Sequence, residues 1–349
     1  MARRRFAIAD AADACGDSSA GAENAFSGGA AANAEDGGAA SCCETIFFPG
    51  CVLLGRAPHV AYRAYELLRE RALVDGTSVL CCGKVLDYDP TVREKRDFVA
   101  RSLAEMLAAH RVKRVVAACP NCVVALRRCI AAAGGMTEVV ALPQVLADAG
   151  IRVDVPAWAP LPLAVHDPCP DRRRCEFADG LRALMPADAL VEKAHSRTTT
   201  RCCGSKARSA GAAERMHADA WSRLHEAQDA GARGIVTSCM SCAVLLSWVG
   251  KTSADPASAE SAASASSASA APPVVSQPAD PASAAPPAAS SASAPVASPA
   301  PSSAVLPAYH YLELLFDEPI VRDGSYPPTP FRLFPGFPAE SAIISPDRK

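Results

Sequence analysis

The sequence predicts an α/β protein made of two similar halves, each built on a parallel sheet. Two observations lead to this fold class. Short apolar runs alternate with amphipathic stretches of helical spacing, which is the pattern of strands and crossover helices in a parallel sheet. The same succession of cysteine-centred motifs also occurs twice along the 349-residue chain. Such a regular repeat indicates that one domain was duplicated.

Short apolar runs predict the buried strands. They are TIFF at 45–48, VVAA at 115–118, LAV at 163–165 and GIVTS at 234–238. Apolar residues at helical spacing predict the helices between them, over 57–72, 92–110 and 210–231. Because cysteines follow the predicted strands, we expect them at the carboxyl ends of the sheets, where open α/β sheets bind ligands.

Two segments lack the side chains that a core requires. Residues 1–43 are rich in Ala, Gly, Asp and Ser, and we expect a disordered N-terminal tail. Residues 253–304 are almost entirely Ala, Ser and Pro, and we expect a flexible insert inside the second half. The two domains are therefore placed at 44–160 and 161–320, and the Pro-rich tail at 321–349 has no assignment.

The bulk composition argues against two classes of protein. A net charge of −2 does not suggest a nucleic-acid-binding protein. No apolar run approaches the roughly 20 residues that span a bilayer. Acidic residues follow the N-terminal arginines at the point where an export signal would be apolar. We therefore expect a cytoplasmic protein without a direct membrane span.

Ten of the fifteen cysteines form two sets of five with matched spacing. Each set has a single cysteine, a Cys-Cys-Gly turn after 29 or 32 residues, and a Cys-x-x-Cys pair after 36 or 35 more. The first set is Cys51, Cys81, Cys82, Cys119 and Cys122, and the second is Cys169, Cys202, Cys203, Cys239 and Cys242. Corresponding cysteines are 118 to 121 residues apart, as expected for two copies of one domain.

The local sequence of each set suits a metal centre. Pro120 is favourable at the first position of a helix, which places Cys119 at the helix start and Cys122 one turn in. Both sulfurs then lie near the positive end of the helix dipole, which favours the thiolate. Gly83 and Gly204 are expected to allow the turn at the adjacent cysteines, through a positive φ or a close backbone approach.

Three kinds of site compete for such cysteines. Structural disulfides are disfavoured, because bonds between adjacent cysteines are strained and a reducing compartment does not sustain them. Zinc in a stabilised interaction module takes four ligands, whereas each set offers five. Iron–sulfur binding is the favoured interpretation. An ordinary cubane cluster also takes four cysteines, so five per set point to an unusual cluster.

The twice-repeated pattern resembles the CCG, or cysteine-rich, domain of the heterodisulfide reductase B subunit. Related domains occur in iron–sulfur subunits of glycolate and lactate oxidation systems and of some fumarate reductases. The resemblance covers about 45–250 and 304–320. It implies two pseudo-symmetric, Rossmann-like halves packed together, and two noncubane 4Fe–4S clusters, each ligated by one five-cysteine set. In that family the clusters face each other and cleave a disulfide between them.

This resemblance implies an oxidoreductase, a disulfide reductase-like subunit of a larger complex. Its substrate would be a small disulfide or another redox couple. Electrons would come from a ferredoxin-like or flavin-containing electron-transfer subunit. The chain has no dinucleotide fingerprint, so we expect it to bind no flavin or nicotinamide itself. A non-catalytic electron relay or redox sensor is the alternative function.

His166 and Asp167 directly precede Pro168 and Cys169, and so enter the loop of the second set. They are the candidate catalytic residues, because one of them could donate a hydrogen bond to a cluster sulfur or pass a proton to a product thiol. A loop-capping Asp and an internally hydrogen-bonded His are the plainer alternative. We expect both residues, with Arg172, near the opening of a site shared by the two halves.

Overall fold

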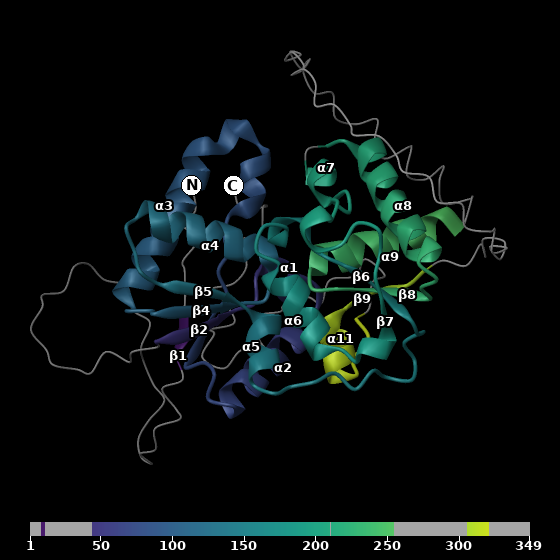
Figure 1. Cartoon of the computed structure of the whole chain (residues 1–349). Helices are drawn as coiled ribbons and strands as arrows, with labels where there is room; N and C mark the ends of the chain where they lie inside the picture. The colour runs from purple at the N-terminus through teal and green to yellow at the C-terminus, as the bar shows by residue number, and fades with distance from the viewer. Residues whose placement is uncertain (1–7, 11–43, 210, 255–305, 321–349) are drawn as a thin grey trace, which may run out of the picture.

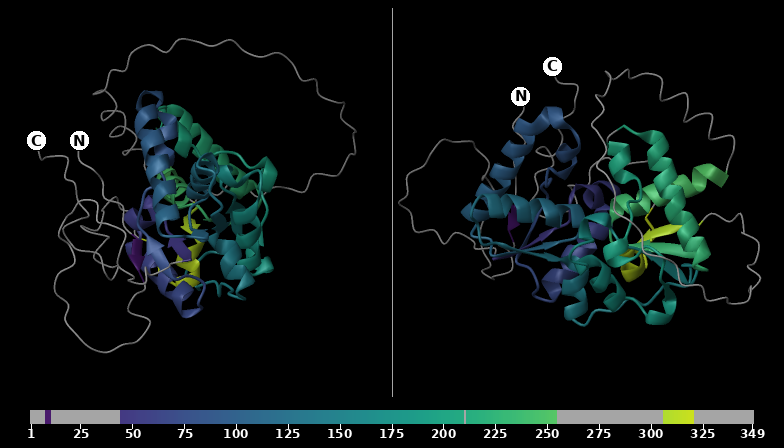
Figure 2. Two further views of the ribbon diagram at one scale, coloured as in Figure 1. Left: turned by 90° about the vertical axis from the view of Figure 1, so that its left-hand side faces the viewer. Right: turned by 45° about the horizontal axis from the view of Figure 1, so that its top comes forward.

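The computed structural model of the chain describes residues 8–10, 44–209, 211–254 and 306–320. Two halves lie side by side, each with a central sheet flanked by helices (Figure 1). The right-hand view of Figure 2 shows the same arrangement with the top turned forward. Within the described part of the chain, every helix is too short or too polar to cross a lipid bilayer.

The first half contains a five-stranded sheet in the order β1-β3-β2-β4-β5. Its strands are β1 (Ile8–Asp10), β2 (Thr45–Phe48), β3 (Gly76–Ser78), β4 (Arg114–Ala117) and β5 (Glu138–Ala141). Its helices are α1 (Cys51–Arg56), α2 (Pro58–Glu70), α3 (Arg93–Ala109), α4 (Pro120–Ala132) and α5 (Leu142–Asp148), with the short 3-10 helices η2 (Lys84–Tyr88) and η3 (Pro90–Val92). Strands β2 to β5 are parallel, and β1 pairs antiparallel with β3 at the edge.

The second half contains a four-stranded parallel sheet in the order β7-β6-β8-β9. Its strands are β6 (Leu163–His166), β7 (Leu190–Val191), β8 (Gly234–Thr237) and β9 (Ala308–His310). Its helices are α6 (Glu176–Leu184), α7 (Ser205–Ser209), α8 (Ala213–Asp229), α9 (Met240–Ala254) and α11 (Tyr311–Phe316), with the 3-10 helices η4 (Cys169–Asp171), η5 (Ala187–Ala189) and η6 (Arg197–Thr199).

The two sheets confirm the expected duplication. If β1 is set aside, each half orders its strands as second, first, third and fourth along the chain. The register also matches: Phe48 at the end of β2 pairs with Ala117, and His166 at the end of β6 pairs with Thr237. Phe48 and His166 therefore occupy the same position in the two copies.

One hydrophobic core joins the halves. It includes Phe47 of β2, Val165 of β6 and Leu181 of α6, so both sheets bury a face in the same interior. Helices α5 and α6 touch there backbone to backbone, because a Cβ on Gly180 would lie 2.5 Å from the amide nitrogen of Gln144. Burial of apolar surface from both copies in one core holds them together as one body.

The sequence predicts a disordered tail over residues 1–43, but residues 8–10 within this segment form strand β1. The edge of β3 offers unpaired backbone groups, and a strand can pair with them whatever its side-chain pattern. The rest of that tail, the insert over 255–305 and the tail over 321–349 lie outside the described residues. Helix α9 continues to Ala254, slightly past the expected start of the insert at 253.

Candidate metal centres

Each cysteine set lies at the carboxyl ends of three neighbouring strands. In the first half Cys51 follows β2, the Cys81–Cys82 pair follows β3, and Cys119 follows β4. Strands β3 and β4 pair with opposite edges of β2, so all three strands end at the same edge of the sheet, where open α/β sheets bind ligands. The second set has the same placement around β6.

Contacts link the five sulfurs of the first set. The sulfurs of Cys51 and Cys81 are 3.8 Å apart. Cys122 hydrogen-bonds to the thiols of Cys119 and Cys82. Cys51 and Cys119 also feel each other's charge and that of Cys81. Three separate loops therefore build one group of sulfur atoms.

The second set repeats this arrangement. The sulfurs of Cys203 and Cys242 are 3.2 Å apart. Cys202 hydrogen-bonds to Cys169 and Cys203, and Cys242 hydrogen-bonds to Cys239. As in the first half, the adjacent cysteines connect the single cysteine to the Cys-x-x-Cys pair.

The turns at the adjacent cysteines form as the sequence predicts. Gly83 and Gly204 have φ angles of +71° and +95°, in the region that favours glycine. Their backbone N–H groups donate to the sulfurs of Cys81 and Cys202, over 3.5 and 3.3 Å. The glycine thus both allows the turn and orients the first sulfur of each pair.

The helix start at the first Cys-x-x-Cys pair is also confirmed. Cys119 is the N-cap of α4 and Pro120 is its first residue. A hydrogen bond from the Cys122 thiol, together with the backbone N–H groups of Cys122 and Asn121, lowers the pKa of Cys119. This sulfur is therefore prepared to act as a thiolate ligand.

Electrostatics in both sets favour a bound cation. Hydrogen bonds that a thiol donates to neighbouring sulfurs, followed by burial, raise the pKa of half of these ten cysteines, namely Cys51, Cys122, Cys169, Cys203 and Cys242. Five adjacent thiols resist joint ionisation, and metal ions remove this resistance by neutralising thiolate charge. None of the described cysteines forms a disulfide. The donor set therefore fits thiophilic metal, with more sulfurs in each half than zinc uses.

Each set has a buried side and an accessible edge. In the first set Cys51 is exposed, and Cys81 and Cys119 are partly exposed. In the second set Cys169 and Cys202 are partly exposed. The buried sulfurs are those of Cys82, Cys122, Cys203, Cys239 and Cys242. In both sets the accessible edge therefore includes the single cysteine and the first cysteine of the pair.

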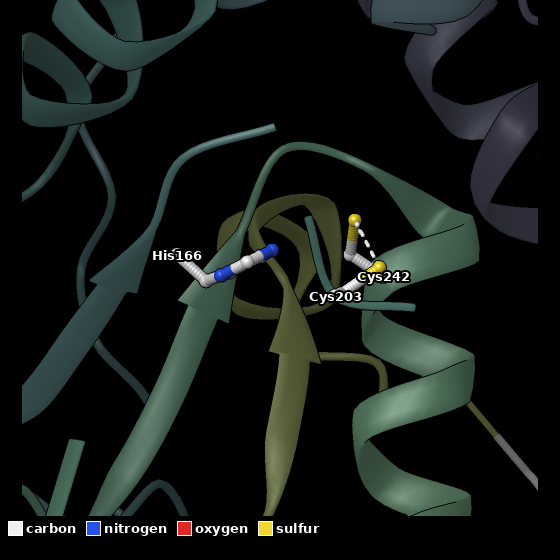
Figure 3. Close-up of side chains that lie close together, drawn as sticks. All are labelled: His166, Cys203 and Cys242. Carbon is white, nitrogen blue, oxygen red and sulfur yellow. Dashed lines mark hydrogen bonds between the residues drawn. The ribbon is translucent and has the colours of Figure 1, made fainter. Parts of the chain in front are cut away.

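His166 is buried within the second site, not near an opening. Its side chain is fully inaccessible, and neither ring nitrogen has a hydrogen-bond partner among the described residues. One of its ring nitrogens and the sulfurs of Cys203 and Cys242 all lie within 4.8 Å of one another, and the ring points toward these sulfurs (Figure 3). Burial, followed by the charges of Lys193 and Arg223, holds the pKa of His166 well below its usual range.

Asp167 is also buried, and the surrounding chain uses all of its acceptor groups. Its carboxylate accepts two hydrogen bonds from Arg182, at 2.8 and 2.9 Å, and one from the backbone N–H of Arg197 at 2.7 Å. Its carbonyl accepts a hydrogen bond from the Thr200 hydroxyl at 2.7 Å. Asp167 therefore holds in place the segment that leads into Cys202 and Cys203. Asp167 is buried, whereas the sequence predicts a place near the opening of the site.

The structure adds Tyr88, which no motif in the sequence indicates. It ends η2 in the first half, six residues after Cys82. Burial, followed by the charges of Cys169 and Cys202, raises the pKa of Tyr88 to about 12. Its hydroxyl thus belongs to the surroundings of the second site. Arg172, in contrast, is exposed, and its place near the opening of a shared site stays a prediction. That the two sets face each other across the interface stays a prediction.

Comparison with known proteins identifies the repeat. A family model described as the CCG cysteine-rich domain matches residues 45–127 and 163–247. These ranges contain all ten clustered cysteines. The match supports metal or iron–sulfur binding by both halves.

Other comparisons add little. No curated protein matches the chain significantly. Among solved structures, a solute-binding protein of an ABC transporter system from Conexibacter woesei DSM 14684 matches at 16% identity, over 58% of this chain and 67% of that chain, with a TM-score of 0.21. At that TM-score the likeness supports no conclusion about fold or function.

Proposed function

Because both halves of this chain belong to the CCG family of cysteine-rich domains, we propose that it is an iron–sulfur oxidoreductase subunit resembling the heterodisulfide reductase B subunit. Each five-cysteine set would hold one 4Fe–4S cluster, of the noncubane kind. The chain would reduce a disulfide, or a related two-electron couple, with electrons from a partner.

One observation carries this proposal: two complete five-thiol groups at equivalent sheet edges, each with an accessible side. A zinc site would leave one cysteine of every set without a role. A single relay centre would need only one complete set. Two intact sets in one body favour chemistry that consumes two electrons, delivered one at a time.

Disulfide reduction consumes two electrons and two protons, and it converts one sulfur–sulfur bond into two thiols. When bound, the clusters supply electrons singly, which nearby side chains cannot do. The chain's own part is to hold the cysteine ligands, to admit the substrate at the edge formed by Cys169 and Cys202, and to bring a proton donor there. The hydroxyl of Tyr88 is a suitable donor, because it lies near both of these cysteines.

An exposed run of three arginines, Arg172, Arg173 and Arg174, begins three residues after Cys169. A basic run beside the accessible edge of the second site suits an anionic substrate or an acidic electron-transfer partner, because opposite charge speeds encounter and orients docking. We expect the partner to be a ferredoxin-like or flavin-containing subunit.

The test is thiol release from a small disulfide by anaerobically purified protein, driven by a low-potential one-electron donor. Wild-type protein and Cys129→Ser should release two thiols per disulfide. Cys129 is a suitable control for Cys119, because it is buried in the same half and belongs to neither set. Its thiol hydrogen-bonds to the carbonyl of Leu126. Cys119→Ser and Cys239→Ser should each abolish the reaction.

Three results would overturn the proposal in different ways. Protein that carries iron and sulfide but cleaves no disulfide across a panel of charged and neutral substrates would be an electron relay. Protein that carries zinc and no sulfide would be a structural module. Unchanged thiol release in both cysteine variants would show that the reaction does not use the two sets.

A further inference from the structure

The two candidate centres differ at one matched position. Phe48 ends β2 and His166 ends β6, which are matched strands of the two halves, and they pair with the last residues of β4 and β8. Phe48 packs in one hydrophobic cluster with Cys82 and Cys122. His166 lies beside Cys203 and Cys242, the corresponding cysteines. A phenyl ring therefore borders the first set where an imidazole ring borders the second.

The imidazole of His166 is aimed at the sulfurs and has no other partner. Its ring points toward Cys203 and Cys242 from the end of β6 (Figure 3). Both ring nitrogens are buried without a hydrogen bond among the described residues. A buried polar group without a hydrogen bond destabilises the fold, so a histidine at this position is expected to serve a group bound between the sulfurs.

Buried positive charge stands behind this histidine. The side chain of Lys193 is fully buried, and its Nζ atom is 3.7 Å from Glu226. Arg223 is also buried and donates to the same carboxylate at 2.6 Å. Both cations act electrostatically on His166. One carboxylate faces two buried cations, so the field on this side of the second site favours added negative charge.

We propose that His166 donates an N–H to sulfur of the second cluster, and that the second centre is therefore easier to reduce than the first. An imidazole always carries at least one N–H, whereas the phenyl ring of Phe48 carries no donor. Hydrogen bonds to sulfur and nearby positive charge stabilise the reduced, more negative state of an iron–sulfur centre. This inference rests on the proposed iron–sulfur function and adds that the two centres are inequivalent.

The experiment is a redox titration of the full-length, anaerobically purified protein, followed by electron paramagnetic resonance. Cys119→Ser isolates the second centre and Cys239→Ser isolates the first. We expect the isolated second centre to favour reduction at least tenfold more than the first, which is 59 mV for a one-electron step. Adding His166→Phe to Cys119→Ser places at this position the residue type of Phe48. This double variant should remove most of the difference in reduction potential.

Two further variants separate hydrogen bonding from packing. His166→Gln keeps an N–H donor and should retain part of the shift. Phe48→Leu changes the wall of the first site without adding a polar group, and should leave the second centre unaltered. Iron and sulfide are counted in every sample.

The outcomes separate the inference from the function on which it rests. Absence of iron in wild-type protein would overturn the iron–sulfur function itself. Two loaded centres with equal potentials, or a second centre that is harder to reduce, would overturn only the inference. Loss of the second cluster's iron from His166→Phe, with iron retained in the first, would show that His166 is a ligand and not a hydrogen-bond donor.

Discussion

The carboxylate of Asp167 accepts a hydrogen bond from each terminal nitrogen of the Arg182 guanidinium, at 2.8 and 2.9 Å, two residues before Cys169 of the second set. The Asp167 side chain is 1% exposed and that of Arg182 is 12% exposed, so this is a buried pair. Arg182 lies on α6. The carboxylate of Asp167 also accepts a hydrogen bond from the backbone N–H of Arg197. The pair therefore ties α6 to the segment that leads into the second Cys-Cys-Gly turn.

Asp167→Asn should destabilise the protein, because one charge of a buried pair is left behind. Breaking such pairs costs about 3–5 kcal/mol, and we expect the lower end, since Arg182 keeps its contact with Glu192. Urea unfolding measures the loss. Glu192→Gln is the control: its partly exposed side chain predicts a cost below about 1 kcal/mol. An Asp167→Asn protein of normal stability but without activity would restore the catalytic role expected from sequence.

Gly204→Ala should damage the second centre more than Gly83→Ala damages the first. A Cβ on Gly204 would lie 2.4 Å from the backbone oxygen of Met216, whereas on Gly83 it would meet side chains only, the nearest being Val99 at 2.8 Å. A side chain can move aside more easily than the backbone of α8. Iron analysis should show loss of about half the iron in Gly204→Ala alone.

Gly134→Ala controls for backbone strain. It has a φ of +68° with no atom within 4 Å of the added Cβ. It should cost about 1–2 kcal/mol, the usual penalty for a left-handed alanine, and lose no iron. If Gly134→Ala and Gly204→Ala behave alike, close approach at Gly204 does not matter.

Much of this fold follows from apolar pattern and repetition. The run TIFF coincides with β2, and the helical spacing over 92–110 corresponds to α3 at Arg93–Ala109. Strand β7 has only two residues, too few to show an apolar pattern in the sequence. It is recognised as a strand because it holds the same place in its sheet as β3 does in the other. Short elements next to the site are therefore what sequence periodicity misses.

The candidate site divides in the same way. Cysteine spacing predicts which sulfurs meet, because each set follows three strands of one sheet. The sequence does not show that His166 points inward, since this depends on which face of β6 its side chain occupies. The sequence does not indicate Tyr88, because this residue belongs to the first half whereas the cysteines whose charges raise its pKa belong to the second half.

Removal of residues 256–304 should leave the second half intact. In the first half, α4 reaches β5 through only residues 133–137, and α9 and β9 are the equivalent elements. A short Gly/Ser connection should serve the same purpose, because loop-closure entropy changes slowly with length. The measurement is iron per chain together with the unfolding midpoint. Selective loss of the second centre would show that the removed segment contributes to it.

Tyr88→Phe should slow thiol release by about tenfold or more without loss of iron, because general-acid groups typically contribute at least this much. Phenylalanine fills the same space and lacks only the hydroxyl. Tyr65→Phe on α2 is a matched control, since its ring packs in the common core away from both sets. Equal rates in the two variants would remove Tyr88 from the proposed chemistry.

The central claim is that each five-cysteine set holds an iron–sulfur cluster. Its most direct test is the iron, acid-labile sulfide and zinc content of anaerobically purified protein. We predict about eight irons and a similar amount of sulfide per chain, falling to about half in either Cys119→Ser or Cys239→Ser. Folded protein that contains zinc but neither iron nor sulfide would contradict this account.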